Sequence, residues 1–310
     1  MKKYTLLFCL LISCGLLNSS VWGAVAPVPK VVASIKPIHA LVAGVMQSVG
    51  EPQLLVKGGG SPHGYVLRPS EARALAQADL IIWIGHQLES FLEKPLATLA
   101  SESRQLELSE VLRNELLPLR TGGSWDVHAH KDAHQAHAAE QLNPHLWLNP
   151  QLAKLIVAHT ASELSAIDPE RQKTYQRNAE HLQQRLDELD RQIRAKLAPV
   201  KDLPYVVFHD AYQYFEVAYG LNPVGSITVD PERKPGVKRL LEMRQKVKAL
   251  DARCVFSEPQ FEPKLVATII EGTGARTGEL DPVGAELEPG VESYFQLMDI
   301  LTEDLLEGLR

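Results

Sequence analysis

The sequence predicts an α/β protein in which two lobes, each built on a parallel sheet, are joined by one long rigid helix. Both halves of the chain alternate short apolar strand patterns with amphipathic helical patterns. Strands that are apolar on both faces belong in parallel sheets that helices cover on both sides. Between the halves lies a charged helical run, residues 169–197, which has no Gly or Pro after its first residue. At about 1.5 Å per residue this run would reach roughly 43 Å, which is longer than a small lobe is wide.

The first half contains three strand patterns and four helical patterns before the joining helix. The strands are expected at residues 31–35, 54–56 and 80–84, and the helices at 38–46, 71–77 and 88–99. Ser70 is placed to cap the second of these helices. A further helix is expected through Leu155 and Ile156.

The joining helix carries one narrow apolar stripe on an otherwise polar surface. Asp168 can cap its start, and Pro169 suits its first turn. Taken alone, such a run is equally well explained as an ordinary surface helix or a coiled-coil segment, and its position between two α/β halves favours the joining role. The stripe consists of Tyr175, Ala179, Leu182, Leu186, Leu189, Ile193 and Leu197.

The second half repeats the alternation of strands and helices without repeating the sequence. Strands are expected at residues 205–208, 253–257 and 276–280, and helices at 211–219, 237–250, 263–272 and 292–306. Gly220 is a good C-cap for the first of these helices. Cys254, in the second strand, has no partner outside the first 23 residues, so we expect it to be a small buried hydrophobe.

The N-terminus resembles a secretory signal. Two lysines, an apolar stretch over residues 4–17 and a small-residue boundary at Gly23 predict a signal peptide over residues 1–23 and a periplasmic or otherwise extracytoplasmic product. A lipoprotein cleavage pattern ends at Cys14, but the apolar core continues beyond it, which favours a soluble protein over an anchored one. The expected domains are then an N-terminal lobe over 24–165, the joining helix over 166–199 and a C-terminal lobe over 200–310.

Four polar residues lie at positions where an open parallel sheet binds ligands. His63 follows one strand pattern, His209 and Asp281 end two others, and His145 lies in a Pro-bounded segment before the joining helix. Three imidazoles and one oxygen donor suit a tetrahedral Zn²⁺ site, although no compact metal-binding motif is present. Of the remaining histidines, we expect His86 to be a turn or cap residue. We expect solvated positions for His39, His159 and His181.

A His-rich segment, residues 126–140, strengthens the metal hypothesis. It is poor in large apolar residues, which favours a mobile loop, and it predicts accessory weak metal ligands. These are His128, His130, His134 and His137.

Four sequence blocks, residues 60–70, 143–148, 208–212 and 278–282, resemble the motif blocks of the metal-binding solute proteins of ABC importers, in their zinc-specific, ZnuA-like branch. The resemblance covers essentially the whole chain after the signal. It implies two α/β lobes joined by one long helix, Zn²⁺ as the transported ligand in the cleft between them, a His-rich loop near the cleft mouth, and a membrane permease as partner.

By position, the resemblance implies that His63 and His145 are ligands from the N-terminal lobe, with His209 and Asp281 from the C-terminal lobe. The imidazole of His209 favours zinc, because the manganese branch typically has a carboxylate there. Some zinc-binding members have Glu directly before the first histidine, where this chain has Pro62. The fourth ligand is therefore either Asp281 or water, and Glu258 is either a residue that orients an imidazole or a cap.

We expect a monomeric zinc-binding protein without catalysis. Two alternatives are a secreted zinc hydrolase, with Glu258 or Asp210 as its base, and a zinc buffer that acts through the His-rich loop alone. The formal net charge of −6 and the absence of a basic patch with interleaved aromatics exclude a typical nucleic-acid partner. Because zinc binding needs neutral imidazoles, we expect affinity to fall more than roughly tenfold from about pH 7.5 to about pH 5.5.

Overall fold

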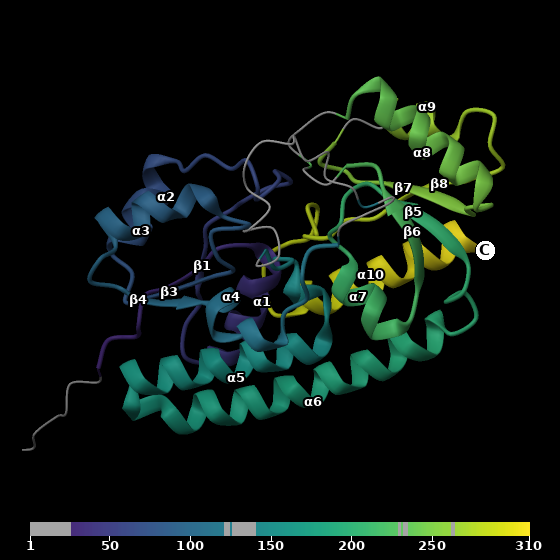
Figure 1. Cartoon of the computed structure of the whole chain (residues 1–310). Helices are drawn as coiled ribbons and strands as arrows, with labels where there is room; N and C mark the ends of the chain where they lie inside the picture. Colours follow the sequence, from purple (N-terminus) through teal and green to yellow (C-terminus); the bar gives the residue numbers. More distant parts are fainter. Residues whose placement is uncertain (1–25, 121–124, 126–140, 229–230, 232–234, 262–263) are drawn as a thin grey trace, which may run out of the picture.

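The computed structural model describes residues 26–120, 125, 141–228, 231, 235–261 and 264–310. The predicted signal peptide and the His-rich segment 126–140 lie outside these residues. The described chain contains two four-stranded sheets in which every strand pairing is parallel (Figure 1). With helices packed on them, they confirm the predicted two-lobe α/β class.

The first sheet has the strand order β2-β1-β3-β4 and the second has the order β6-β5-β7-β8. The first comprises β1 (Val31–Ala33), β2 (Gln53–Leu54), β3 (Leu80–Trp83) and β4 (Arg104–Glu107), and the second β5 (Pro204–Val207), β6 (Asn222–Ser226), β7 (Cys254–Ser257) and β8 (Arg276–Glu279). Sequence patterns did not predict β4 and β6. Both are edge strands with exposed polar residues at their starts, so neither shows the continuous apolar run of a central strand.

Ten α-helices cover the sheets in the described part of the chain. They are α1 (Lys36–Val45), α2 (Pro69–Ala76), α3 (Glu93–Leu99), α4 (Leu108–Val111), α5 (Pro150–Ile167), α6 (Gln172–Leu197), α7 (Gln213–Tyr219), α8 (Val237–Ala249), α9 (Lys264–Ile270) and α10 (Glu292–Leu309). Short 3-10 turns occur at η1 (Ser90–Leu92), η2 (Arg113–Glu115), η5 (Leu146–Leu148) and η6 (Pro169–Arg171). Ser70 is not the cap of α2 as predicted, because that helix begins at Pro69 and the Glu71 carboxylate accepts the Arg68 N–H.

The joining helix is α6, and all seven residues of its predicted stripe are buried. Its start differs from the prediction: residues 169–171 form η6, and the Asp168 side chain caps no backbone N–H there. The Asp168 carboxylate instead accepts hydrogen bonds from the Tyr175 hydroxyl at 2.7 Å and from Arg171 at 2.9 Å. Asp168 therefore fixes the corner between α5 and α6 through side chains.

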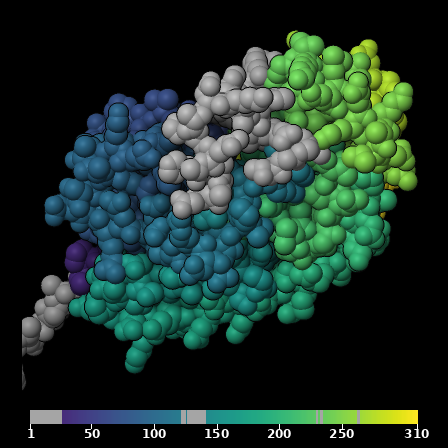
Figure 2. Space-filling view, viewed as in Figure 1, coloured from purple at the N-terminus to yellow at the C-terminus, as the bar shows by residue number. Residues whose placement is uncertain are grey.

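Helix α6 runs beneath both sheets and packs along α5 (Figure 1). It contacts α1 in the first lobe and α7 in the second. Helix α1 approaches α6 closely at Gly44, where an added Cβ would lie 2.7 Å from a Leu182 methyl carbon. In the space-filling view, α5 and α6 form a teal layer on which the blue first lobe and the green second lobe both rest (Figure 2).

A second helix, α10, also spans the two lobes, and the sequence patterns did not predict that role. It packs against α1 in the first lobe and against β7 and β8 in the second. One buried apolar cluster continues through the inner faces of both sheets and through α1, α5, α6 and α10. Two smaller clusters cover the outer faces of the first and the second sheet. The lobes therefore share one core. No helix in the described residues is long and apolar enough to cross a membrane.

Candidate metal centre

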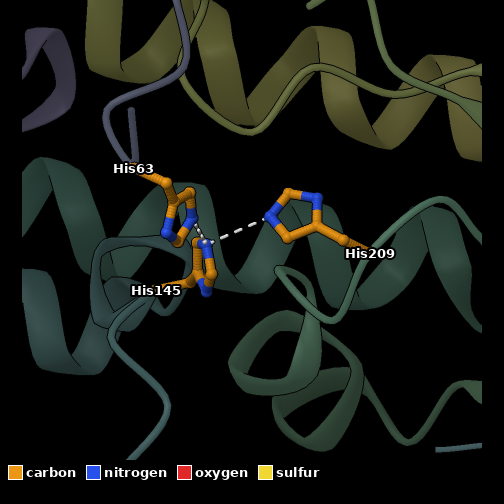
Figure 3. A group of neighbouring side chains, drawn as sticks. All are labelled: His63, His145 and His209. Atoms are coloured by element: carbon orange, nitrogen blue, oxygen red, sulfur yellow. Dashed lines mark hydrogen bonds between the residues drawn. The ribbon is translucent and has the colours of Figure 1, made fainter. Parts of the chain in front are cut away.

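Three of the predicted ligands converge on one point between the lobes (Figure 3). His63 lies between β2 and α2, His145 directly precedes η5, and His209 follows β5. The Nε2 atom of His145 lies 3.3 Å from Nε2 of His63 and 3.2 Å from Nε2 of His209. In the described chain these three residues form the one group of three or more histidine, cysteine or carboxylate side chains close enough to share a metal ion.

The spacing of these nitrogens fits one zinc ion. Nitrogens bound to Zn²⁺ at about 2.0–2.1 Å in a tetrahedron lie roughly 3.3–3.4 Å apart. Two of the three nitrogen pairs already have nearly that separation, and all three ligand atoms lie within 4.8 Å of one another. The metal-binding geometry therefore needs little rearrangement of the side chains.

Burial keeps two of the three imidazoles neutral. Desolvation and the neighbouring His209 lower the pKa of His63 to about 3. Desolvation, with His209 and His63 nearby, also lowers the pKa of His145 well below its usual range. A neutral imidazole has a free lone pair for a metal ion, so both side chains are ready to bind at neutral pH.

Hydrogen bonds orient two of the imidazoles from behind. The Nδ1 atom of His209 lies 2.6 Å from a Glu258 carboxylate oxygen, and Nδ1 of His145 lies 2.8 Å from Oδ1 of Asn143. Because both partners are acceptors, Nδ1 carries the proton in each ring and Nε2 keeps its lone pair toward the centre. Of the two roles left open for Glu258, the structure favours the orienting one. The sequence patterns do not single out Asn143, although it opens the block of residues 143–148, two residues before His145.

Asp281 lies outside the group of converging nitrogens. Its carboxylate accepts hydrogen bonds from the backbone N–H groups of Val283, Gly284 and Ala285 and from the Gln260 amide at 3.0 Å. These contacts fix the turn after β8. A role for Asp281 as fourth ligand stays a prediction, as does the alternative of water.

The cavity at the three histidines is lined largely by apolar side chains from both lobes. Trp147 and Pro62 come from the first lobe, and Phe261, Pro282 and Val283 come from the second. The Trp147 indole N–H donates to the Pro282 carbonyl at 2.7 Å. This hydrogen bond joins the two lobes at the wall of the cavity. Such a lining limits water access and strengthens electrostatic interactions within the cavity.

The other histidines that the structure describes lie outside this centre. His39 was expected to be solvated, but it is buried, with Nε2 lying 2.9 Å from the Pro52 carbonyl, because α1 is covered on nearly every side. His86 lies in a turn, as expected, and His181 is exposed, while His159 is partly buried. The four predicted accessory ligands, His128, His130, His134 and His137, lie outside the described residues.

Comparisons with known proteins agree with one another. Residues 31–308 match the family model described as "Zinc-uptake complex component A periplasmic". A relative from Brucella abortus (strain 2308), named "High-affinity zinc uptake system protein ZnuA", is 44% identical over 304 residues, covering 90% of this chain and 91% of the relative. A relative of the same name from Yersinia pestis is 34% identical over 290 residues, again covering 90% and 91%. A solved structure described as "Crystal structure of ZnuA" shares the fold, with a TM-score of 0.77, 22% identity and coverage of 92% of this chain and 100% of that one.

Proposed function

Because this chain belongs to the zinc-uptake complex component A family, we propose that it captures Zn²⁺ outside the cytoplasm and delivers it to the permease of an ABC importer. The observation that carries this proposal is the convergence of His63, His145 and His209: Nε2 of His145 lies 3.3 Å from Nε2 of His63 and 3.2 Å from Nε2 of His209, close to tetrahedral spacing. Imidazole nitrogens suit zinc better than harder ions such as Mg²⁺ or Ca²⁺, which prefer oxygen ligands.

The proposed role is binding without catalysis. A zinc hydrolase needs an open metal position and a general base placed beside it. Of the two candidate bases, Glu258 is engaged with Nδ1 of His209, and the Asp210 carboxylate forms an ion pair with Arg120. Both carboxylates therefore have structural partners, and the family is one of solute-binding proteins.

Several further features belong to this proposal. Residues 1–23 would direct export and be removed, leaving the soluble two-lobe protein as a monomer in the periplasm. The domain limits 24–165, 166–199 and 200–310 remain our division of the chain. The fourth zinc ligand would be water or Asp281, and the His-rich segment 126–140 would hold additional zinc more weakly.

The test is a Zn²⁺ titration against a competing chelator, with His63→Ala, His145→Ala and His209→Ala compared with the wild-type protein. Loss of one nitrogen ligand from a buried site should weaken tight binding by at least a hundredfold, roughly 2.7 kcal/mol. His181→Ala, which changes an exposed imidazole on α6, is the matched control and should bind as the wild type does. Tight binding that survives all three ligand substitutions would refute the assignment.

The loop alternative has its own test. If the histidine cluster is the tight site, deleting residues 126–140 should remove only a weaker binding phase. If the protein is a buffer that acts through the loop alone, the same deletion should abolish tight binding.

A further inference from the structure

The Asn143 side chain lies between a ligand of the first lobe and the backbone segment that carries a ligand of the second. It is fully buried. Its Oδ1 atom accepts the His145 backbone N–H at 3.0 Å and lies 2.8 Å from Nδ1 of the His145 ring. Its Nδ2 atom donates to the Asp210 backbone carbonyl at 2.8 Å and to Oε1 of Gln213 at 2.9 Å.

These contacts use the complete hydrogen-bonding capacity of the amide, two acceptor positions and two donor positions. The backbone of Asn143 is held as well: its N–H donates to the Leu117 carbonyl at 2.8 Å, and its carbonyl accepts the Tyr214 hydroxyl at 2.7 Å. The side chain is therefore fixed from both lobes and has one orientation that satisfies every partner.

We infer that Asn143 is a positioning residue that sets the tautomer of His145 and, through Asp210, the position of the segment that carries His209. This inference rests on the proposed function, since it concerns how that site is prepared for zinc. One end of the amide keeps Nε2 of His145 free of a proton. The Nδ2 group of the same amide bonds the Asp210 carbonyl to the first lobe, and Asp210 directly follows His209.

No other side chain of similar size performs both tasks. Asp at position 143 would still accept from the His145 ring, but it has no N–H for the Asp210 carbonyl and would place a carboxylate oxygen against it. Leu would fill the same space with neither an acceptor nor a donor. Asp and Leu substitutions therefore separate the two tasks, because one removes only the donor and the other removes both.

The first measurement is the tautomer of His145, read from long-range proton–nitrogen NMR correlations of the imidazole rings in the metal-free protein. Wild type and Asn143→Asp should show the proton on Nδ1 alone, and Asn143→Leu should show a mixture with Nε2 protonated. Asn222→Ala, which removes an exposed amide donating to the Asp202 carbonyl, is the control and should match wild type. A single Nδ1–H tautomer in Asn143→Leu would overturn the inference.

The second measurement is backbone hydrogen exchange over residues 208–213 in the metal-free protein. Both Asn143→Asp and Asn143→Leu should exchange faster there, because both lose the bond to the Asp210 carbonyl. If exchange in Asn143→Asp matches the wild type, the inference that Asn143 positions the His209 segment through Asp210 would be overturned. If Asn143→Leu does not fold, Asn143→Asp still tests that inference by exchange.

The third measurement is the rate of zinc release to a chelator. Loss of a partner that orients a metal-binding imidazole typically costs about 10- to 100-fold in affinity, and Asn143→Leu should show that loss mainly as faster release. Release from Asn143→Leu at the wild-type rate would overturn the link to zinc. The tautomer and exchange measurements are made without zinc. If the wild-type protein has no tight zinc site, the proposed function is refuted, whereas the positioning role is still tested by these two measurements.

Discussion

The two sides of the junction between the lobes are held together by different forces. On the side of α5, α6 and α10, the lobes share one apolar core, and the stripe on α6 is buried along its whole length. On the side of the metal centre, polar and directional contacts join the lobes beside an apolar cavity lining, such as the hydrogen bonds of Asn143 and the Trp147 indole. Apolar burial dominates folding stability, and directional hydrogen bonds fix geometry. The difference suggests that stability and zinc binding can be changed separately.

The largest effect on stability should come from the apolar side. Leu186 on α6 is fully buried in the shared core, so Leu186→Ala should lower the free energy of unfolding by about 2–5 kcal/mol. Zinc affinity of the folded fraction should change little, because the histidines are held by other contacts. Leu155→Ala on α5 is the matched control, since Leu155 is 37% exposed and its removal leaves a smaller cavity. Denaturant unfolding and zinc titration of the same samples check both claims, and equal losses in both variants would contradict them.

The next effect should come from the polar side. Glu258→Gln weakens the acceptor that holds Nδ1 of His209, so zinc affinity should fall about 10- to 100-fold, equivalent to roughly 1.4–2.7 kcal/mol. The amide can also accept the same hydrogen bond, so stability should change by less than the Leu186 substitution changes it. Glu180→Gln, on the exposed side of α6, controls for the loss of one negative charge. Unchanged zinc affinity in Glu258→Gln would mean that the carboxylate does not support the ligand.

The pH dependence should be smaller for zinc binding than the sequence suggested. Burial lowers the pKa of His63 to about 3 and that of His145 well below 6.5, so these two sites hold no protons that must leave at pH 5.5. The cost appears instead in stability: the unfolded imidazoles take up protons below about pH 6.5 and the folded ones do not, so acid favours unfolding. For His63, the resulting decrease in the free energy of unfolding is at most about 2 kcal/mol at pH 5. The decrease begins near pH 6.5 and grows progressively toward pH 3.

Denaturant unfolding of the metal-free protein at pH 7 and pH 5 measures this loss. His63→Ala should reduce it, because the substitution removes one group that is kept neutral by burial. If zinc affinity instead falls steeply between pH 7 and pH 5, with a slope that shows three protons released on zinc binding, the low pKa values would be contradicted.

The sequence predicted the parts of the molecule that have a strong local signal. The central strands are continuous apolar runs, and the stripe on α6 has a clear helical spacing, so both were predicted correctly. His63 and His209 were found because they follow strand ends, and all three histidines because they lie in motif blocks. Edge strands β4 and β6, the spanning role of α10 and the role of Asn143 depend on contacts between distant segments. His39 was placed wrongly for the same reason, because the residues that bury it come from other elements.

The smallest expected change is in the overall shape on zinc binding. Helices α6 and α10 both span the lobes. Helix α6 contains no Gly or Pro at which it could bend. Rotating one lobe against the other would also open the shared core, whereas the histidine segments are joined to it by a few hydrogen bonds. Zinc release should then depend on local movement of the segments around His63, His145 and His209.

Small-angle scattering with and without zinc should give nearly the same radius of gyration for the two states, because the shared core stays closed. Hydrogen exchange should change mainly in the segments that carry His63, His145 and His209, with α6 and α10 equally protected in both states. His145→Ala, which removes a proposed ligand, should show no such zinc-dependent change in exchange and serves as the control. A clear decrease in radius on zinc binding, together with altered protection along α6, would mean that the lobes close as rigid bodies. The contrast between a fixed apolar side and an adjustable polar side would then be wrong.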